Sequence, residues 1–216
     1  MKLFKRLSPT PTPLPRGEKE DFPEYELIAG VDEAGRGPLA GPLVVAGVIL
    51  KTDAFHAILN DSKKLSEKKR EMLYDWVVDN SVAYQIEVVS VEMIDRLNIL
   101  GATMFGMDRV AEELTIRPNM VLFDGNMTPM DYEIRKGVGW KIIDYDCLSI
   151  VRGDGMYACI AAASVLAKVA RDRIMVEMDL KYPEYGFKGH KGYPTKRHFE
   201  MIKEYGVCDE HRRTFL

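Results

Sequence analysis

Residues 25–50, YELIAGVDEAGRGPLAGPLVVAGVIL, contain two apolar runs separated by a short segment rich in glycine and proline. The first run, residues 25–35, and the second, Leu43–Leu50, have the apolar character expected of buried β-strands. Because few residues separate them, we expect the two strands to be antiparallel neighbours. Asp32 and Glu33 lie near the end of the first strand, so this stretch predicts a sheet that carries adjacent carboxylates at one of its edges.

The rest of the chain alternates between strand and helix patterns. Further strands are predicted at 82–91, 120–123 and 141–151, and helices after a cap at Ser66, around 107–114 with an end by Pro118, and at 160–181. The first helix is expected to bury Met72, Leu73, Trp76 and Val77 on one face, whereas the last is apolar nearly all round and should be central. This order predicts an α/β domain with a central mixed β-sheet flanked by helices and a small helical C-terminal part.

Composition divides the chain into three parts. Residues 1–24 are rich in proline and charge and are predicted to form a flexible tail. Residues 25–180 should form the ordered domain, because a chain of 216 residues with 46% hydrophobic content can bury one sizeable core. Residues 181–216 are basic and mainly helical in pattern.

The charge and cysteine content limit the possible functions and locations. A formal net charge of -3 argues against global electrostatic adhesion to nucleic acid but allows a local basic groove. The three cysteines form no C-x-x-C pair, which fits a reducing compartment. The N-terminus lacks the apolar core of a secretory signal, and no stretch is apolar enough to span a bilayer. We therefore expect a cytoplasmic protein with no membrane partner.

Four carboxylates follow apolar runs and stand beside glycines: Asp32, Glu33, Asp124 and Asp154. Strands expected before them would end at one edge of the sheet, where open α/β sheets place their sites. Converging carboxylates repel one another unless a cation binds between them, and oxygen ligands select Mg²⁺ or Mn²⁺. A pair of such ions suits the attack of water on a phosphodiester. The pattern therefore predicts a metal-dependent nuclease.

Spacing alone leaves other interpretations open. The chain has 33 acidic residues, most of which must be solvated, and Asp144 and Asp146 also share one strand face. A glycosidase would use paired acids without a metal, but it usually adds aromatic sugar platforms, and no tryptophan lies beside these acids. A nucleic-acid binding module without turnover would not keep so much negative charge facing phosphates. Strict dependence of cleavage on a divalent metal distinguishes these three classes.

Six longer motifs carry a resemblance to a known family. They are AGVDEAGRGPLAGPLVVAGVIL (29–50), NDSKKLSEKKRE (60–71), VLFDGN (121–126), AAASVLAKVARDR (161–173), YGFKGHKGYPTKRH (185–198) and HRRTF (211–215). In this order they resemble bacterial ribonuclease HII over nearly the whole chain after Tyr25. Arg36 stands where the related type HIII enzymes carry lysine, which favours type HII.

The resemblance implies a ribonuclease H-like fold and a metal-dependent endonuclease. Such an enzyme hydrolyses the RNA strand of RNA/DNA hybrids and cuts on the 5′ side of ribonucleotides embedded in duplex DNA. It leaves 5′-phosphate and 3′-hydroxyl ends and serves ribonucleotide removal in replication and repair. The implied cofactor is Mn²⁺ or Mg²⁺, with one ion in the free protein and two with substrate. The implied partners are hybrid and ribonucleotide-containing duplexes, bound by a monomer whose segment 181–216 completes the substrate groove.

The resemblance also assigns roles to individual residues. Asp32, Glu33, Asp124 and Asp154 match the catalytic and metal-binding acids. The substrate-binding positions are Gly35, Arg36, Gly37, Asn60, Ser62, Lys63, Arg152, Ser164 and Tyr193. The glycines beside Arg36 would let backbone groups approach a ribose, whose 2′-hydroxyl both donates and accepts. Tyr193 would stack on the next nucleotide, although the residue also fits a structural tyrosine, and Ser164 fits simple helix packing.

Two features qualify this assignment. His190, Lys191, Lys196 and Arg197 could hold phosphates beside Tyr193, but a basic run is usually a solvated face. Arg152, Met156 and Cys159 depart from the lysine, lysine and serine that are common in the family, and these departures affect the substrate contacts near Asp154 rather than the metal site. Cys159 is interpreted as a small packing residue of a buried helix.

Overall fold

The computed structural model describes residues 21–51, 66–139 and 145–216. Asn60, Ser62, Lys63 and Asp144, together with most of the predicted tail, lie outside these residues. The described part already packs before Tyr25, since Phe22 is 5% exposed and lies in one hydrophobic cluster with Tyr157.

A five-stranded mixed sheet forms the centre of the fold, with the strand order β3-β2-β1-β4-β5. The strands are β1 (Ile28–Ala34), β2 (Leu43–Leu50), β3 (Ser81–Val89), β4 (Met120–Asp124) and β5 (Asp146–Ile150). β1 pairs antiparallel with β2, and β2 with β3, whereas β4 is parallel to both β1 and β5. The predicted mixed sheet and the predicted antiparallel pair at its start are both confirmed.

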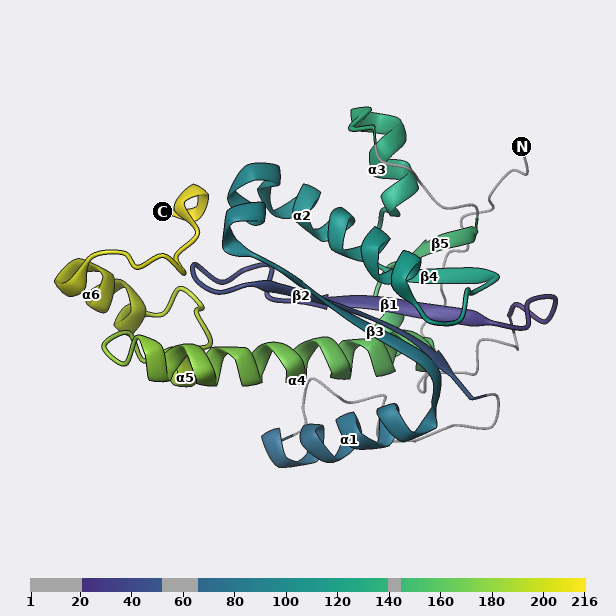
Figure 1. The fold of residues 1–216 in the computed structure, drawn as a ribbon, viewed down its shortest axis with the longest axis horizontal. Helices are drawn as coiled ribbons and strands as arrows, with labels where there is room; N and C mark the ends of the chain where they lie inside the picture. The colour runs from purple at the N-terminus through teal and green to yellow at the C-terminus, as the bar shows by residue number, and fades with distance from the viewer. Residues whose placement is uncertain (1–20, 52–65, 140–144) are drawn as a thin grey trace.

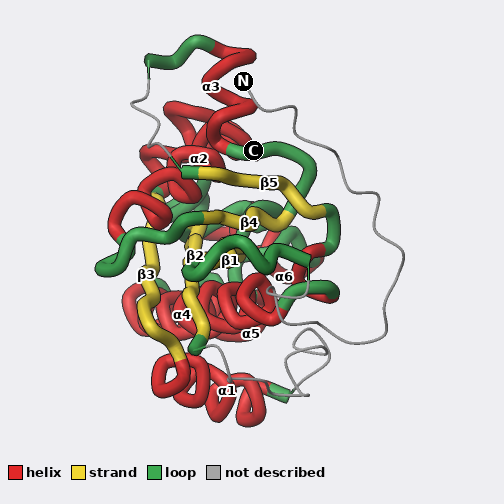
Figure 2. Tube along the Cα trace, turned by 90° about the vertical axis from the view of Figure 1, so that its right-hand side faces the viewer, coloured by secondary structure: helices red, strands yellow, loops and turns green. Residues whose placement is uncertain are grey.

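Helices cover both faces of the sheet (Figure 1). On one face lie α4 (Ala158–Lys181) and α1 (Glu67–Asn80), and on the other lie α2 (Val91–Glu113) and α3 (Pro129–Lys136). Viewed along the sheet, the strands form a layer between these two helical layers (Figure 2). Alanines of α4 pack directly on the sheet with no exposed surface, so the prediction of a central buried helix is confirmed.

Two short helices, α5 (Phe187–His190) and α6 (Lys196–Tyr205), follow α4 at one end of the molecule (Figure 1). They are held there by a small hydrophobic cluster that includes Met175, Tyr185 and Phe187. The last residues then return to the loop after β1, where Ala40 and His211 form an isolated antiparallel bridge. Segments that are far apart in the sequence therefore meet next to the end of β1.

The predicted elements differ from the structure in several details. In α1, Leu73 and Val77 are buried as predicted, but Met72 is 65% exposed, and the side chain of Ser66 makes no capping hydrogen bond. α2 begins at Val91, which the sequence pattern places in the preceding strand, so the helix starts 16 residues before the predicted segment 107–114; it ends at Glu113, before Pro118. The periodicity of α2 is interrupted because Asn98 has φ 57° and its side chain accepts hydrogen bonds from the two amides at residues 100 and 101.

α3 was not predicted, although its ends carry clear signals. Thr128 and Asp131 form a reciprocal capping box, Pro129 occupies the first turn, and Gly137 ends the helix with a left-handed backbone. With only eight residues, the helix is too short to show apolar periodicity. No helix in residues 21–51, 66–139 or 145–216 combines the length and apolar character needed to cross a membrane.

Candidate active site

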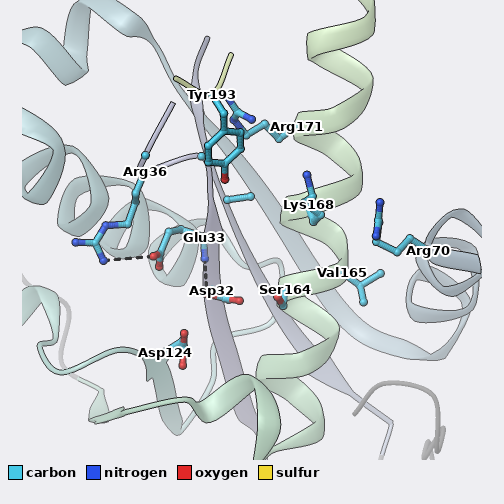
Figure 3. A pocket seen from close by; sticks show the side chains of 13 residues that line it. Asp32, Glu33, Arg36, Arg70, Asp124, Ser164, Val165, Lys168, Arg171 and Tyr193 are labelled. Atoms are coloured by element: carbon cyan, nitrogen blue, oxygen red, sulfur yellow. Dashed lines mark hydrogen bonds and ion pairs between the residues drawn. The ribbon is translucent and has the colours of Figure 1, made fainter. Parts of the chain in front are cut away.

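A cavity of about 420 Å³ opens at the carboxyl ends of β1 and β4 (Figure 3). Three acids line it, together with four cations, one tyrosine and five small or apolar residues of β1, the loop after it and α4. The acids are Asp32, Glu33 and Asp124; the cations are Arg36, Arg70, Lys168 and Arg171; the others are Tyr193, Ala34, Gly35, Gly37, Ser164 and Val165. The parallel pairing of β1 with β4 sets Val31 opposite Phe123, so the acids that follow these two residues come side by side. The pairing thus places Asp32 beside Asp124, and Glu33 lines the same cavity.

Asp32 is the most enclosed of the three acids, with 4% of its surface exposed. Its carboxylate accepts a hydrogen bond from the Glu33 amide at 2.8 Å. Burial, followed by the charges of Glu33 and Asp124, raises the pKa of Asp32 well above its ordinary value, while a hydrogen bond from Ser164 opposes that rise. A carboxylate buried between two others is unfavourable on its own, so the site favours a bound cation.

Asp124 is oriented by the turn that follows β5. The Gly153 amide donates to Asp124 Oδ1 at 2.6 Å, and Gly153 begins the 3-10 turn η3 (Gly153–Gly155). Asp154 is the next residue of this turn and is partly buried, but it is not among the residues that line the cavity. Arg152 precedes the turn with φ 59°, is exposed and likewise does not line the cavity. The turn therefore orients Asp124 through the Gly153 amide, and Asp154 is the next residue in the chain after Gly153.

Glu33 faces Arg36 rather than its fellow acids (Figure 3). Its carboxylate lies 3.4 Å from the Arg36 guanidinium, and half of the Arg36 side chain is exposed. Across the described ranges, no three Asp, Glu, His or Cys side chains are already gathered around one point. The donor set nevertheless fits a hard divalent cation, because three carboxylates share one cavity, and burial together with the charges of the other two raises the pKa of Asp32.

The loop after β1 needs glycine at Gly35 for two reasons. Its φ of 100° is in the left-handed range, and a Cβ atom there would lie 2.1 Å from Nε of Arg171. A Cβ on Gly37 would lie 3.6 Å from the Tyr193 ring, which stands at the mouth of the cavity and is 44% exposed. Of the predicted substrate residues, the structure thus brings the loop residues, Ser164 and Tyr193 to the acids.

Sequence reasoning predicted Arg36 but missed the other three cations of this cavity, Arg70, Lys168 and Arg171. Ser164, Lys168 and Arg171 are spaced i, i+4 and i+7, so they share one face of α4, and that periodicity could have identified them. Arg70 comes from α1 and has no such signal. Of the predicted basic flank, Lys196 and Arg197 are exposed, whereas both ring nitrogens of His190 are engaged, by Tyr185 O and by the Gly192 amide. Cys159 is fully buried in α4, as its interpretation as a packing residue requires.

The family model described as Ribonuclease HII matches residues 29–216. The chain belongs to the ribonuclease HII family. It is 49% identical over 215 residues to the ribonuclease HII of Shewanella amazonensis, covering 100% of this chain and 95% of that one. It is also 50% identical over 189 residues to the ribonuclease HII of Francisella tularensis subsp. novicida, covering 88% and 96% of the two chains.

Solved structures agree with this assignment. The ribonuclease H2 of Pyrococcus horikoshii superimposes with a TM-score of 0.70 at 29% identity, covering 88% of this chain and 93% of that one. The enzyme is therefore an endonuclease with the ribonuclease H-like fold that hydrolyses the RNA strand of RNA/DNA hybrids, as the sequence motifs predicted. The two alternative interpretations, a glycosidase and a non-catalytic binding module, are therefore wrong.

Proposed function

We propose that this ribonuclease HII cuts duplex DNA on the 5′ side of a single embedded ribonucleotide, in addition to hydrolysing hybrids. The observation that carries the proposal is the position of the loop Gly35–Gly37 and of Tyr193 at the same cavity as Asp32, Glu33 and Asp124. The acids would act on the phosphate, while the loop beside them would sense the ribose and the tyrosine ring would stack on the next nucleotide. Recognition of the ribose and cleavage of the phosphodiester would then take place at the same nucleotide.

The direction of the cut requires an external nucleophile. The 2′-hydroxyl of a ribonucleotide neighbours its own 3′ phosphate, so it cannot attack the phosphate on its 5′ side. Water must attack that phosphorus as the bond to the preceding 3′ oxygen breaks, and the leaving oxygen takes a proton. The products would be a 3′-hydroxyl and a 5′-phosphate on the ribonucleotide.

We assign Asp32, Glu33 and Asp124 as the residues that hold Mg²⁺ or Mn²⁺, with Asp154 completing the site from the turn behind Asp124. When bound, the metal lowers the pKa of a water and neutralises charge on the phosphate. A fold neighbour, Bst-RNase HIII in complex with Mn²⁺, supports this choice of ion. Glu33 would leave Arg36 to join the metal, and Arg36 would then be available to the nucleic acid. Lys168 and Arg171 would contribute positive charge on the α4 side of the cavity.

The remaining expectations rest on the same proposal. We expect the segment 181–216 to complete the substrate groove, since it supplies Tyr193, and Arg152, Asn60, Ser62 and Lys63 to contact phosphates along the duplex. We propose one metal ion in the free protein and two with substrate. We also propose a monomer that acts in the cytoplasm in ribonucleotide removal during replication and repair.

The test is cleavage of a labelled DNA duplex that contains one ribonucleotide, with Mg²⁺, with Mn²⁺ and with chelator, followed by mapping of the ends. We expect a metal-dependent cut on the 5′ side of the ribonucleotide, lost in Asp124→Asn and retained in Asp75→Asn, an exposed carboxylate of α1. Cleavage of a continuous hybrid but not of this duplex would refute the proposal, while leaving the family activity intact.

A further inference from the structure

The two parts of the proposed ribose site come from distant segments that are locked together beneath the surface. The Leu39 amide donates to Gly192 O at 2.8 Å, and the Arg212 amide donates to Leu39 O at 2.8 Å. A Cβ on Gly192 would lie 2.3 Å from Ala40 O, so the two backbones are in direct contact. The loop after β1, the segment before Tyr193 and the C-terminal segment therefore form a single unit.

The side chain of Arg212 lies at the centre of this unit and is fully buried. Its guanidinium donates to Gly35 O at 2.7 Å, to Arg36 O at 3.2 Å, to Gly41 O at 2.9 Å and to Pro42 O at 3.1 Å. Within the described part of the chain, its hydrogen bonds all go to these backbone carbonyls. A planar guanidinium with five donors can hold several carbonyls in fixed directions, which a flexible ammonium cannot. Arg212 thus joins both ends of the loop.

A second buried arginine connects the same loop to Tyr193. Arg171 is 1% exposed and donates to Pro42 O at 3.0 Å and to Ala40 O at 3.2 Å. Its guanidinium also lies 6.0 Å from the centre of the Tyr193 ring, within the range of a cation–π contact. Because Arg171 belongs to α4, which also carries Ser164, the loop is fixed relative to the acids as well.

A histidine pair completes the connection from the other side. One ring nitrogen of His198 bonds Tyr193 O at 3.0 Å, the other lies 3.1 Å from Nε2 of His211, and the Cys208 amide donates to His211 Nδ1 at 3.0 Å. His198 must donate to the Tyr193 carbonyl, and His211 must accept from the Cys208 amide. Only one proton arrangement satisfies both contacts: both rings are neutral, and Nε2 of His211 donates to Nε2 of His198. The backbone of Tyr193 is thereby tied to the residue next to Arg212.

We infer that Arg212 is a positioning residue for ribose recognition: by holding the carbonyls of Gly35 and Arg36, it fixes the loop in its recognition geometry before the nucleic acid arrives. A preorganised loop loses less conformational entropy on binding and presents its backbone groups in one direction. This inference rests on the proposed function, because only a ribose-sensing loop would lose discrimination when it loosens. Arg212 itself would not touch the substrate.

The experiment measures binding rather than turnover. In the Asp124→Asn background, fluorescence anisotropy gives the Kd for a labelled DNA duplex with one ribonucleotide and for the same duplex in all-DNA form. The variants are Arg212→Met, which removes every donor, Arg212→Lys, which keeps the charge, and Arg135→Met, a control at an exposed arginine of α3. Thermal unfolding of each variant identifies those that are folded at the assay temperature.

We expect Arg212→Met to lower the preference for the ribonucleotide duplex about tenfold, the equivalent of one or two hydrogen bonds to the ribose. The Kd for all-DNA duplex should change much less, Arg212→Lys should be intermediate, and Arg135→Met should match the parent. If the role of Arg212 were purely structural, Arg212→Met would weaken the binding of both duplexes alike. If Arg212→Met does not fold, Arg212→Lys decides.

Two outcomes would overturn the inference, and they differ. An unchanged preference in the folded Arg212 variant, with a clear preference in the parent, would show that the loop holds its geometry without this side chain, and would leave the proposed function standing. Equal binding of both duplexes by the parent would instead refute the proposed ribose sensing and remove the inference with it.

Discussion

Replacing Gly30 by alanine should disrupt the close contact between β1 and α4 next to the active site. Gly30 lies in β1 two residues before Asp32, so both face the same side of the sheet, where α4 crosses. A Cβ on Gly30 would lie 2.3 Å from the backbone C of Cys159 and 2.3 Å from the backbone N of Ile160. Ordinary contacts of this kind are no shorter than about 3.4 Å, so β1 and α4 must separate by roughly 1 Å at this point.

Neither element can move cheaply. β1 is paired on both edges, with β2 and with β4, and α4 is buried between the sheet and α1. Overpacking in a core costs about 1–3 kcal/mol, and a clash between two backbones should reach the upper end, about 3 kcal/mol. For a chain of this size, each kcal/mol lowers Tm by about 2–4 °C, which gives a fall of about 6–12 °C.

The assay is thermal unfolding followed by circular dichroism, together with cleavage of an RNA/DNA hybrid below the lowered Tm. Cleavage should fall as well, because separation at Gly30 draws Asp32 away from Ser164 on the same helix. Gly189→Ala is the control, since a Cβ there meets nothing within 4 Å. A Gly30→Ala variant with a Tm within about 2 °C of wild type would refute the reasoning, because it would mean that α4 shifts freely on the sheet.

Three further predictions concern charge. Asp124→Asn should lower cleavage at least about 100-fold but change Tm little, because an amide oxygen can still accept from the Gly153 amide; a large fall in Tm would contradict this. Asp32→Asn should abolish cleavage yet stabilise the chelator-treated protein at pH 8 by about 1–3 kcal/mol, because it removes a charge buried beside two others; urea unfolding checks the sign. Burial and the neighbouring His198 lower the pKa of His211 from 6.5 to about 4, so the unfolded chain takes up the proton first. The free energy of unfolding should therefore fall by up to about 3 kcal/mol as the pH drops from about 6.5 to about 4. In urea unfolding, His211→Asn should show a smaller fall over the same pH range, because it lacks the contribution of His211.

Much of the fold could be predicted because its signals are local. The apolar runs of β1, β2 and β4 and the apolar surface of α4 lie within single segments, and the acids Asp32 and Asp124 directly follow the apolar residues of their strands. The errors arose where local signals conflict or are short. Asn98 interrupts the periodicity of α2, α3 is too brief to show a period, and Met72 lies on a helix whose buried face only the neighbouring α4 defines.

The sequence by itself determined the family and predicted the acids and the glycine loop, because these depend on residue types in fixed local order. Only the tertiary structure decided which groups surround them. It set Lys168 and Arg70 at the cavity, turned Glu33 toward Arg36, and brought Arg171 and Arg212 under the loop from residues more than a hundred positions away. The physical reason is that buried backbone carbonyls and buried charges must find partners wherever the packed chain supplies them, and no local pattern encodes that choice.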